Sequence, residues 1–386
     1  MRIVPSFVTQ WKNALGFKSL PVASKSIVFY SEGKPSSPHL GPLIQELVDR
    51  GRSVQLLISD RDDPLADKDD PRIESHWIGT GSARTWVYSG LEASVFVTTT
   101  PDIETMQLKR SKHGVYYIYA HHSMISTHMG YRPGAFDHFD AIFCTGPHHV
   151  EETRAHEARQ GLPGKTLLEQ GYCRLDTLRA ASENSARRRA SEEPESAPTV
   201  LLAPTWGVNS ILPTCGEELI EILLRADYRV VLRPHPETTR KSSALIRAIS
   251  DRFGEHAGFG FDGDPTGDAS MHRADLMISD WSGVAMEYAY GFEKPVLFID
   301  LPRKVNNPAY VELEIEPMEV TVRNEVGETV GLNELVEVPD MIDRLIPVDP
   351  GRVNDIRRSY EKRVFSRGSS AGVGADFIEK IVDERQ

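Results

Sequence analysis

Short apolar runs alternate with amphipathic stretches along most of the chain, and this alternation constrains the fold more than any other feature. In the first cycle, residues 26–30 form an apolar run, residues 39–50 have helical spacing, and residues 54–59 form a second apolar run. The runs lack polar alternation, which is typical of strands covered on both faces in a parallel sheet. The pattern therefore predicts β-α-β units in a doubly wound domain.

The same alternation continues to residue 144 and starts again near residue 200. The first series adds a helix at 83–90 and strands at 93–97, 115–120 and 141–144; the second has strands at 200–204, 229–233, 276–279 and 295–299 and helices at 217–226 and 243–253. We therefore predict an α/β protein with two Rossmann-like doubly wound domains facing across a cleft. Ligands of such open sheets bind at the carboxyl ends of the strands.

The length of 386 residues suits two domains with connecting structure. We expect an N-terminal arm at 1–25, a first Rossmann-like domain at 26–180 and a second Rossmann-like domain at 199–350. Residues 181–198 are rich in Arg, Glu, Ser and Ala, and are the expected linker. Residues 351–386 are expected to form a helical segment that packs back on the N-terminal domain.

Composition excludes several classes of protein. The net charge of −12 disfavours a nucleic-acid partner, because phosphate-backbone binding requires a wide basic surface. No run approaches the roughly 18 apolar residues of a membrane span, and no secretory signal is apparent. Three widely spaced cysteines (Cys144, Cys173 and Cys215) argue against a disulfide framework and a zinc cluster. We expect a cytoplasmic protein.

The N-terminal arm has two interpretations. Apolar residues between positions 5 and 20 recur near helical spacing, with Lys12 and Lys18 among them. The arm is either a helix packed on its own domain or an interfacial helix that makes peripheral contact with the inner face of the plasma membrane.

The strongest local pattern lies at residues 275–287, where an apolar strand gives way to a polar turn and then to a helix. Backbone N–H groups of Ser282, Gly283 and Val284 would point away from the helix start and attract a diphosphate. We include Asp280, at the start of the turn, in this diphosphate site. Glu287, one turn into the helix, is positioned to bind ribose hydroxyls. The alternative is a plain capped junction between strand and helix.

A second pattern ends the strand at 229–233. Arg233 can bind a phosphate bidentately, and His235, held between two prolines, can donate to a phosphate oxygen or bear charge as a leaving group departs. A structural role for the histidine is the alternative.

In the N-terminal domain, His121, His122 and Ser123 follow the strand at 115–120. One histidine is a candidate general base for an acceptor hydroxyl, and the other would pack beside it. The alternative is that both only end the strand. Asp262 and Asp264 have the spacing of a metal site, but their Gly- and Pro-rich surroundings favour a solvated turn, so we expect no metal.

Taken together, these segments resemble the CDP-glycerol glycerophosphotransferase family, the teichoic-acid polymerases and primases with a GT-B fold. The matching segments are 118–121, 171–176, 203–206, 233–236 and 279–283. The resemblance implies that His121 is the counterpart of the family's catalytic histidine and that His235 is also catalytic. It further implies that Pro204 and Thr205 bind the nucleotide and that Arg174, with His122 and Ser123, faces the acceptor.

The chain departs from the family pattern at four positions. Ala120 and His122 replace the Trp and Gly that flank the family histidine, Gly283 replaces a serine, and Gly207 replaces an arginine. These departures concentrate on the acceptor side, so the reaction type is better defined than the acceptor.

The resemblance implies attack by an acceptor hydroxyl on the distal phosphorus of a CDP-linked donor, with release of CMP and with no cofactor or metal required. The acceptor would be a glycan, a lipid-linked group or a polyol phosphate. Two alternatives remain: a glycosyltransferase or epimerase that uses a UDP-sugar, and a non-catalytic nucleotide-binding partner in polymer assembly.

Overall fold

The structure is a computed structural model that describes residues 6–67, 69–104, 108–189, 197–264, 267–347 and 349–385. The chain divides into two compact units. The first comprises the described residues up to His122, Tyr131–Arg174, and those from Val364 on; the second comprises Ser123–Gly130 and Leu175–Arg363. Each unit is described by itself.

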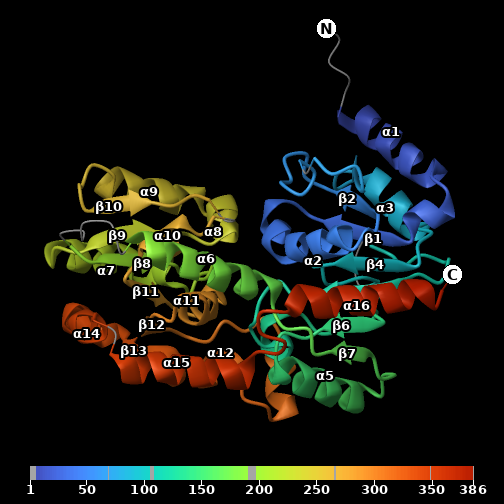
Figure 1. The fold of residues 1–386 in the computed structure, drawn as a ribbon. Coiled ribbons are helices and arrows are strands. Elements are labelled where there is room, and N and C mark those ends of the chain that lie inside the picture. Colours follow the sequence, from blue (N-terminus) through green and yellow to red (C-terminus); the bar gives the residue numbers. More distant parts are fainter. Residues whose placement is uncertain are drawn as a thin grey trace, which may run out of the picture. The chain divides into compact units, whose positions relative to one another are not determined.

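The first unit is built on a parallel sheet with the strand order β3-β2-β1-β4-β5-β6-β7 (Figure 1). Its strands are β1 (Ile27–Ser31), β2 (Val54–Ile58), β3 (Ile73–Trp77), β4 (Val95–Thr98), β5 (Tyr116–Ala120), β6 (Ala141–Phe143) and β7 (Thr166–Leu168). Every residue of β1, β2 and β4 is buried, as expected of strands covered on both faces. The direction in which successive strands are added to the sheet therefore reverses between β1 and β4.

The helices of the first unit include one from the end of the chain. They are α1 (Ser6–Ser19), α2 (Ser37–Asp49), α3 (Ser82–Ser89), α5 (Pro147–Gln160) and α16 (Ser370–Asp383), with 3-10 turns η1 (Val22–Lys25) and η2 (Lys34–Ser36). Glu379 of α16 accepts hydrogen bonds from Arg50 (2.9 Å) and Arg52 (2.7 Å), and Ala375 and Ile378 join the apolar core that contains Leu43.

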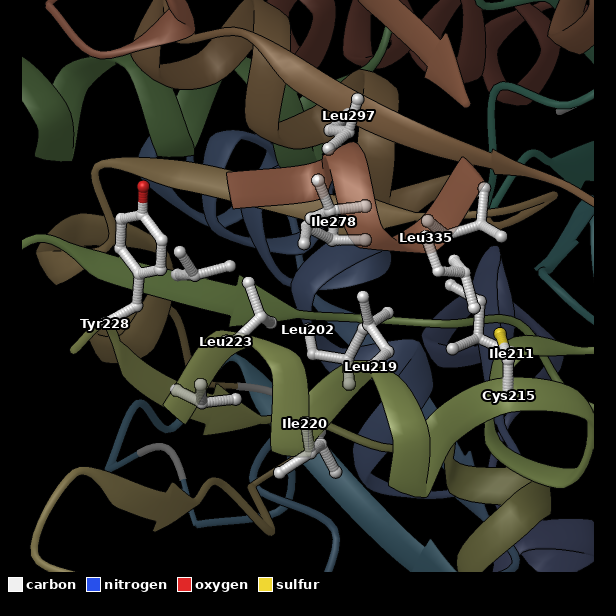
Figure 2. Packing of buried hydrophobic residues seen from close by; sticks show 14 of the residues in the cluster. Leu202, Ile211, Cys215, Leu219, Ile220, Leu223, Tyr228, Ile278, Leu297 and Leu335 are labelled. Atoms are coloured by element: carbon white, nitrogen blue, oxygen red, sulfur yellow. The ribbon is translucent and has the colours of Figure 1, made fainter. Parts of the chain in front are cut away.

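The second unit has a parallel sheet with the order β10-β9-β8-β11-β12-β13. Its strands are β8 (Thr199–Leu202), β9 (Arg229–Leu232), β10 (Phe259–Phe261), β11 (Leu276–Ser279), β12 (Val296–Asp300) and β13 (Gly327–Gly331). Apolar residues of α7 (Ile211–Arg225), among them Leu219 and Leu223, pack against Leu202 and Ile278 of the strands (Figure 2).

The remaining helices surround this second sheet or connect its strands. They are α4 (Thr127–Gly130), α6 (Cys173–Arg189), α8 (Pro236–Lys241), α9 (Ser243–Phe253), α10 (Ala269–Arg273), α11 (Val284–Phe292), α12 (Met318–Thr321), α13 (Arg323–Val326), α14 (Val338–Leu345) and α15 (Pro350–Arg363), with 3-10 turns η3 (Pro308–Leu313) and η4 (Leu332–Glu337).

The predicted fold class, two Rossmann-like parallel-sheet domains, is confirmed. The predicted linker at 181–198 is wrong in its first half, because residues 181–189 continue helix α6; residues 190–196 lie outside the described residues. The two helices of the C-terminal segment at 351–386 belong to different units. Helix α15 belongs to the second unit, whereas α16 packs on α2 in the first.

The N-terminal arm forms helix α1, which packs on its own domain. Phe17 and Ala14 are fully buried, and the side-chain amide of Asn13 donates to the carbonyl of Trp77 in β3 at 3.1 Å. Phe7 and Leu15 on the other side of the helix are 59% and 56% exposed. The arm is therefore part of the domain core and also presents an apolar face.

Candidate active site

The sheet order of the second unit identifies where its ligand site lies. β9 and β11 flank β8 on opposite sides, so the direction of winding reverses between β8 and β11. Ligands of open α/β sheets bind at such a switch point, outside the carboxyl ends of the strands. The segments that follow these strands contain Thr205, His235 and Asp280.

Asp280 connects two of the loops at the carboxyl edge of the second sheet. Its carboxylate accepts hydrogen bonds from the backbone N–H groups of Thr205 (2.6 Å), Ile211 (3.0 Å) and Trp281 (2.7 Å). Burial raises the pKa of Asp280, and these three N–H groups oppose that rise. The side chain is 2% exposed and committed to these bonds. Its inclusion among diphosphate ligands was therefore wrong: Asp280 ties the loop after β8 to the turn after β11.

The turn after Asp280 leads into α11 as the sequence predicts. The first amides bonded within the helix turn are those of Ala285, to the carbonyl of Ser282 (3.2 Å), and Met286, to that of Gly283 (3.2 Å). The N–H groups of Ser282, Gly283 and Val284 precede them, at the positive end of the helix dipole. Ser282, Gly283 and Val284 are half-buried. The junction thus has the geometry that an anion site requires.

Trp281 fixes the turn to the body of the unit. Its indole N–H donates to the carbonyl of Leu301 at 2.9 Å, and the guanidinium of Arg323 lies 3.5 Å from the ring centroid. Arg323 also donates to the carbonyl of Asp280 at 3.2 Å. Glu287 lies in the first turn of α11 and is half-buried, at the position that the sequence assigned to ribose binding.

His235 is the N-cap of α8, and its ring is oriented by the backbone. Its Nδ1 accepts a hydrogen bond from the N–H of Glu237 at 3.1 Å. The neutral ring therefore carries its proton on Nε2. This tautomer leaves Nε2–H as the group able to donate to a phosphate oxygen.

Arg233 is held inside the unit. Its guanidinium donates to the carbonyl of Gly267 (2.7 Å) and to Ser270 Oγ (3.3 Å), and it pairs with Asp262 at 3.4 Å. The side chain is 9% exposed. The hydrogen bonds of its Nη1 anchor the loop after β10. The assignment of Arg233 to the donor diphosphate stays a prediction. Asp262, in turn, is engaged by Arg233 and Ser270, and it accepts from the N–H of Asp264 as in a solvated turn.

Two lysines that the sequence analysis missed, Lys241 and Lys304, lie beside Trp206, the last residue of the matching segment 203–206. Trp206 follows Thr205, and the ammonium groups of Lys241 and Lys304 each lie 4.2 Å from its ring centroid. Lys304 also donates to Thr205 Oγ1 at 2.9 Å. Thr205 and Pro204 are buried. Lys304 follows β12 in a loop without a recognisable motif, so only the sheet order could have indicated its position.

Gly207 explains one departure from the family pattern. Its φ is +113°, a backbone conformation that L side chains rarely adopt, and the space around it is open. The arginine expected at this position would strain the loop.

Ser123 and Gly283 lie against each other within the second unit. A Cβ on Gly283 would lie 2.4 Å from Ser123 Oγ. The serine hydroxyl therefore occupies the space beside α11 that a side chain at 283 would need. The structure places Ser123 at the start of α11, in the second unit, whereas His122, the residue before it in the chain, belongs to the first unit.

In the first unit, His121 lies at the end of β5 in an aromatic environment. Its ring stacks on His149 of α5, with centroids 3.8 Å apart and 25° between the planes, and Tyr119 contacts it edge-on at 4.8 Å. Among the described residues, neither ring nitrogen of His121 has a hydrogen-bond partner. Burial lowers the pKa of His121 well below its usual value, and the neighbouring histidines His149, His122 and His148 add to this effect. The ring is therefore neutral at pH 7.

His122 adopts a different environment from His121. Its Nδ1 donates to the carbonyl of Thr99 at 3.1 Å, and burial lowers its pKa. The ring of His39, which the sequence analysis missed, lies 6.2 Å from that of His122 and stacks on Tyr172 at 5.6 Å. Arg174 is buried close enough to His39 to help lower the pKa of that histidine.

Each unit has a parallel, doubly wound sheet, which is the architecture of the GT-B fold. The family model described as CDP-Glycerol:Poly(glycerophosphate) glycerophosphotransferase matches residues 17–303. The chain belongs to this family, and it is a transferase of the CDP-glycerol type. A search of the curated proteins gives no match.

Solved structures show the same fold. A histidine-to-asparagine variant of the wall teichoic acid polymerase TagF, soaked with CDPG, is 19% identical, with 97% of this chain and 94% of that chain covered and a TM-score of 0.64. A glycosyltransferase from Rickettsia africae is 12% identical, with coverage of 92% and 98% and a TM-score of 0.51. At these identities the likeness shows the fold alone.

No helix in the part of the chain that the structure describes is both long and apolar enough to cross a bilayer.

Proposed function

We propose that this transferase moves glycerol phosphate, or a similar polyol phosphate, from a CDP-linked donor to a hydroxyl of a teichoic-acid-like polymer, surface glycan or glycolipid. The observation that carries the proposal is the family match over residues 17–303, which includes both His121 and the turn at Asp280. The TagF structures share the fold of this chain, and because their title names a wall teichoic acid polymerase, we include a teichoic-acid-like acceptor in the proposal.

The proposed reaction is a displacement at the phosphorus distal to the nucleoside. The acceptor oxygen forms the new P–O bond, the bond to the bridging oxygen breaks, and CMP leaves with the electron pair. His121 takes the proton of the acceptor hydroxyl, a role that requires the neutral ring that its burial favours. This division of roles assigns acceptor activation to the first unit.

The second unit would hold the donor. N–H groups of Ser282, Gly283 and Val284 and the Nε2–H of His235 would stabilise charge on the diphosphate as it develops. Glu287 would bind the ribose hydroxyls. The proposed mechanism needs no metal or cofactor, since these donors supply the charge stabilisation.

Variants test this division of roles. His121→Ala should abolish transfer while leaving CDP binding within about 3-fold of wild type, and His235→Ala should lower kcat by about 100-fold or more. Calorimetry with CDP and single-turnover assays measure the two effects. A His121→Ala protein that kept its turnover would contradict the assignment of the base.

We also propose that helix α1 makes peripheral contact with an anionic membrane. Phe7, Val8 and Leu15 are at least half exposed, Lys12 on the same helix is also exposed, and the first 31 residues contain no acidic residue. An exposed apolar helix face with basic residues is typical of interfacial helices.

Deleting the arm would remove Phe17 from the core, so substitutions give the sharper test. Phe7→Ser/Leu15→Ser should weaken sedimentation with vesicles containing anionic lipid. Val336→Ser, which changes a 76% exposed apolar residue in the second unit, is the matched control and should have no effect. Equal vesicle binding by wild type and the double variant would contradict the membrane role of α1.

A further inference from the structure

A group of cations surrounds Trp206 at the carboxyl edge of the second sheet. The ammonium groups of Lys304 and Lys241 each lie 4.2 Å from the centroid of the indole ring, and the ring of His235 lies 6.3 Å from it. Trp206 follows β8, His235 follows β9, and Lys304 follows β12. Three separate strand ends therefore contribute to one cluster, beside the switch point of the sheet.

The two lysines differ in how their charges are balanced. Lys241 forms an ion pair with Glu237 at 2.7 Å and is exposed. Lys304 is half-buried, and within the described residues no carboxylate lies within ion-pair distance of it. Its one hydrogen bond among those residues goes to Thr205 Oγ1 at 2.9 Å. An ammonium group has three N–H donors, so Lys304 retains donors for a ligand.

Thr205 connects Lys304 to the predicted anion site. The N–H of Thr205 donates to Asp280, and Asp280 also accepts from the N–H of Trp281, which begins the turn into α11. Two residues, Thr205 and Asp280, therefore link Lys304 to this turn through hydrogen bonds. Because the ring of Trp206 stabilises a cation held against it, the ammonium is positioned before any ligand binds.

The electrostatics agree with this geometry. Burial, with a smaller contribution from the charge of Lys241, lowers the pKa of Lys304 to about 8, although Asp280 and Glu237 oppose this shift. A partly desolvated cation without an ion pair is costly, and an anionic ligand would relieve that cost. The positive end of α11 and the Nε2–H of His235 favour a ligand with several anionic oxygens, as a diphosphate has.

We propose that Lys304 binds a phosphate oxygen of the nucleoside diphosphate donor, with Trp206 and Thr205 positioning its ammonium group. This inference rests on the proposed function and adds a donor-binding residue to it. Lys304, from the loop after β12, thereby supplies a phosphate-binding cation next to the loop after β8, where Gly207, with φ of +113°, disfavours a side chain.

Binding of CDP to the full-length protein, measured by calorimetry, tests the proposal. Lys304→Met should weaken CDP binding by about 10- to 100-fold, the range expected for loss of a charge-assisted hydrogen bond. Lys304→Arg keeps the charge and should retain most of the affinity. Lys241→Met is the matched control, because it removes a lysine equally close to Trp206 but already paired with Glu237, and it should change CDP affinity less than about 3-fold.

The pH dependence adds a readout that loss of packing would not reproduce. In the wild type, CDP affinity should fall as pH rises through about 8, where Lys304 loses its proton. The other titratable groups around Lys304 are Asp280, Glu237 and Lys241. Hydrogen bonds from Arg240 and Lys241 lower the pKa of Glu237 to about 2, so Glu237 stays ionised throughout this pH range. The alkaline fall should be absent in Lys304→Met.

The possible results separate the inference from the proposed function. Equal CDP affinity in wild type and Lys304→Met, with the alkaline fall unchanged, would overturn the role of Lys304 and leave the transferase assignment intact. Failure of the wild type to bind CDP at all would overturn the proposed function and the inference together. Selective loss of CDP binding in Lys304→Met, with wild-type thermal stability, would support both.

Discussion

The imidazole rings of His121 and His149 stack with centroids 3.8 Å apart. His149 is fully buried, and its Nδ1 accepts from the N–H (3.3 Å) and Oγ1 (3.2 Å) of Thr145, which fixes the ring and places its proton on Nε2. The proposed base is therefore held by an aromatic neighbour, and neither of its ring nitrogens is bonded to a described carboxylate. The face of His121 that stacks on His149 is closed to water.

This stacking predicts unequal effects of two substitutions at 149. His149→Phe keeps an aromatic ring against His121 and should retain kcat within about 3-fold. His149→Ala frees the ring and admits water, so kcat should fall about 10-fold or more. Admitting water also relieves the burial that lowers the pKa of His121, so the acidic limb of the kcat/KM profile should move to higher pH. Superimposable pH profiles for the two variants would refute this positioning role.

Buried neutral histidines also predict acid sensitivity of the fold. Burial lowers the pKa of His39, His121 and His122, so the unfolded chain binds protons near pH 6.5 that the native state does not. Stability should therefore be intact above pH 6.5 and fall below it, by about 1.4 kcal/mol per pH unit for each such proton. Urea unfolding at pH 5.5 and 7.5 measures the slope. The variant His121→Phe should reduce the slope of stability with pH by the contribution of about one proton. An unchanged slope would contradict this account.

Asp280 should be more sensitive to amide substitution than its neighbour Asp275. Asp280 accepts from three backbone N–H groups, and an asparagine, which has a single acceptor oxygen, would direct an NH2 group at one of them. We expect Asp280→Asn to cost about 1–3 kcal/mol of unfolding free energy. Asp275 accepts from the N–H of Thr199 at 2.9 Å, a bond that asparagine can keep. Equal losses in the two variants, measured by urea unfolding, would contradict the proposed role of Asp280.

The contact between Ser123 and Gly283 predicts a compensating pair. Gly283→Ala places a Cβ 2.4 Å from Ser123 Oγ and should cost about 1–3 kcal/mol, whereas the backbone φ of −61° adds no strain. Removing the hydroxyl with Ser123→Ala leaves a 3.7 Å contact, so the double variant should recover most of the stability. A double-mutant cycle of unfolding free energies measures the coupling. Additive losses of unfolding free energy in the double variant would show that the two residues are not in contact.

The sequence predicted the central strands because their burial is uninterrupted. β2, for example, is apolar apart from Gln55 and is buried along its full length. The strands β3, β7, β10 and β13 were missed. Each is short or partly exposed, as in β3, where Glu74 and Ser75 face solvent, so the apolar pattern is weak. Edge strands owe their pairing to the neighbouring strand more than to their own sequence.

The candidate site was predictable only where its residues form a local pattern. The turn from Asp280 to Val284 and the tautomer-fixed His235 follow from the neighbouring backbone. The hydrogen bonds of Arg233 could not be predicted from its local pattern, because its partners Gly267 and Ser270 lie 34 and 37 positions later in the chain. Lys304 was missed for the same reason, since its contact with Thr205 spans 99 positions.

The nucleotide released from a panel of activated donors tests the assignment most directly. With CDP-glycerol, CDP-linked polyols and UDP-sugars offered together with a glycerol-phosphate polymer, chromatography identifies the product. The account predicts release of CMP from a CDP-linked polyol, dependent on acceptor and lost in His121→Ala. Release of UDP from a UDP-sugar, or binding of CDP-glycerol without turnover on any acceptor, would contradict it.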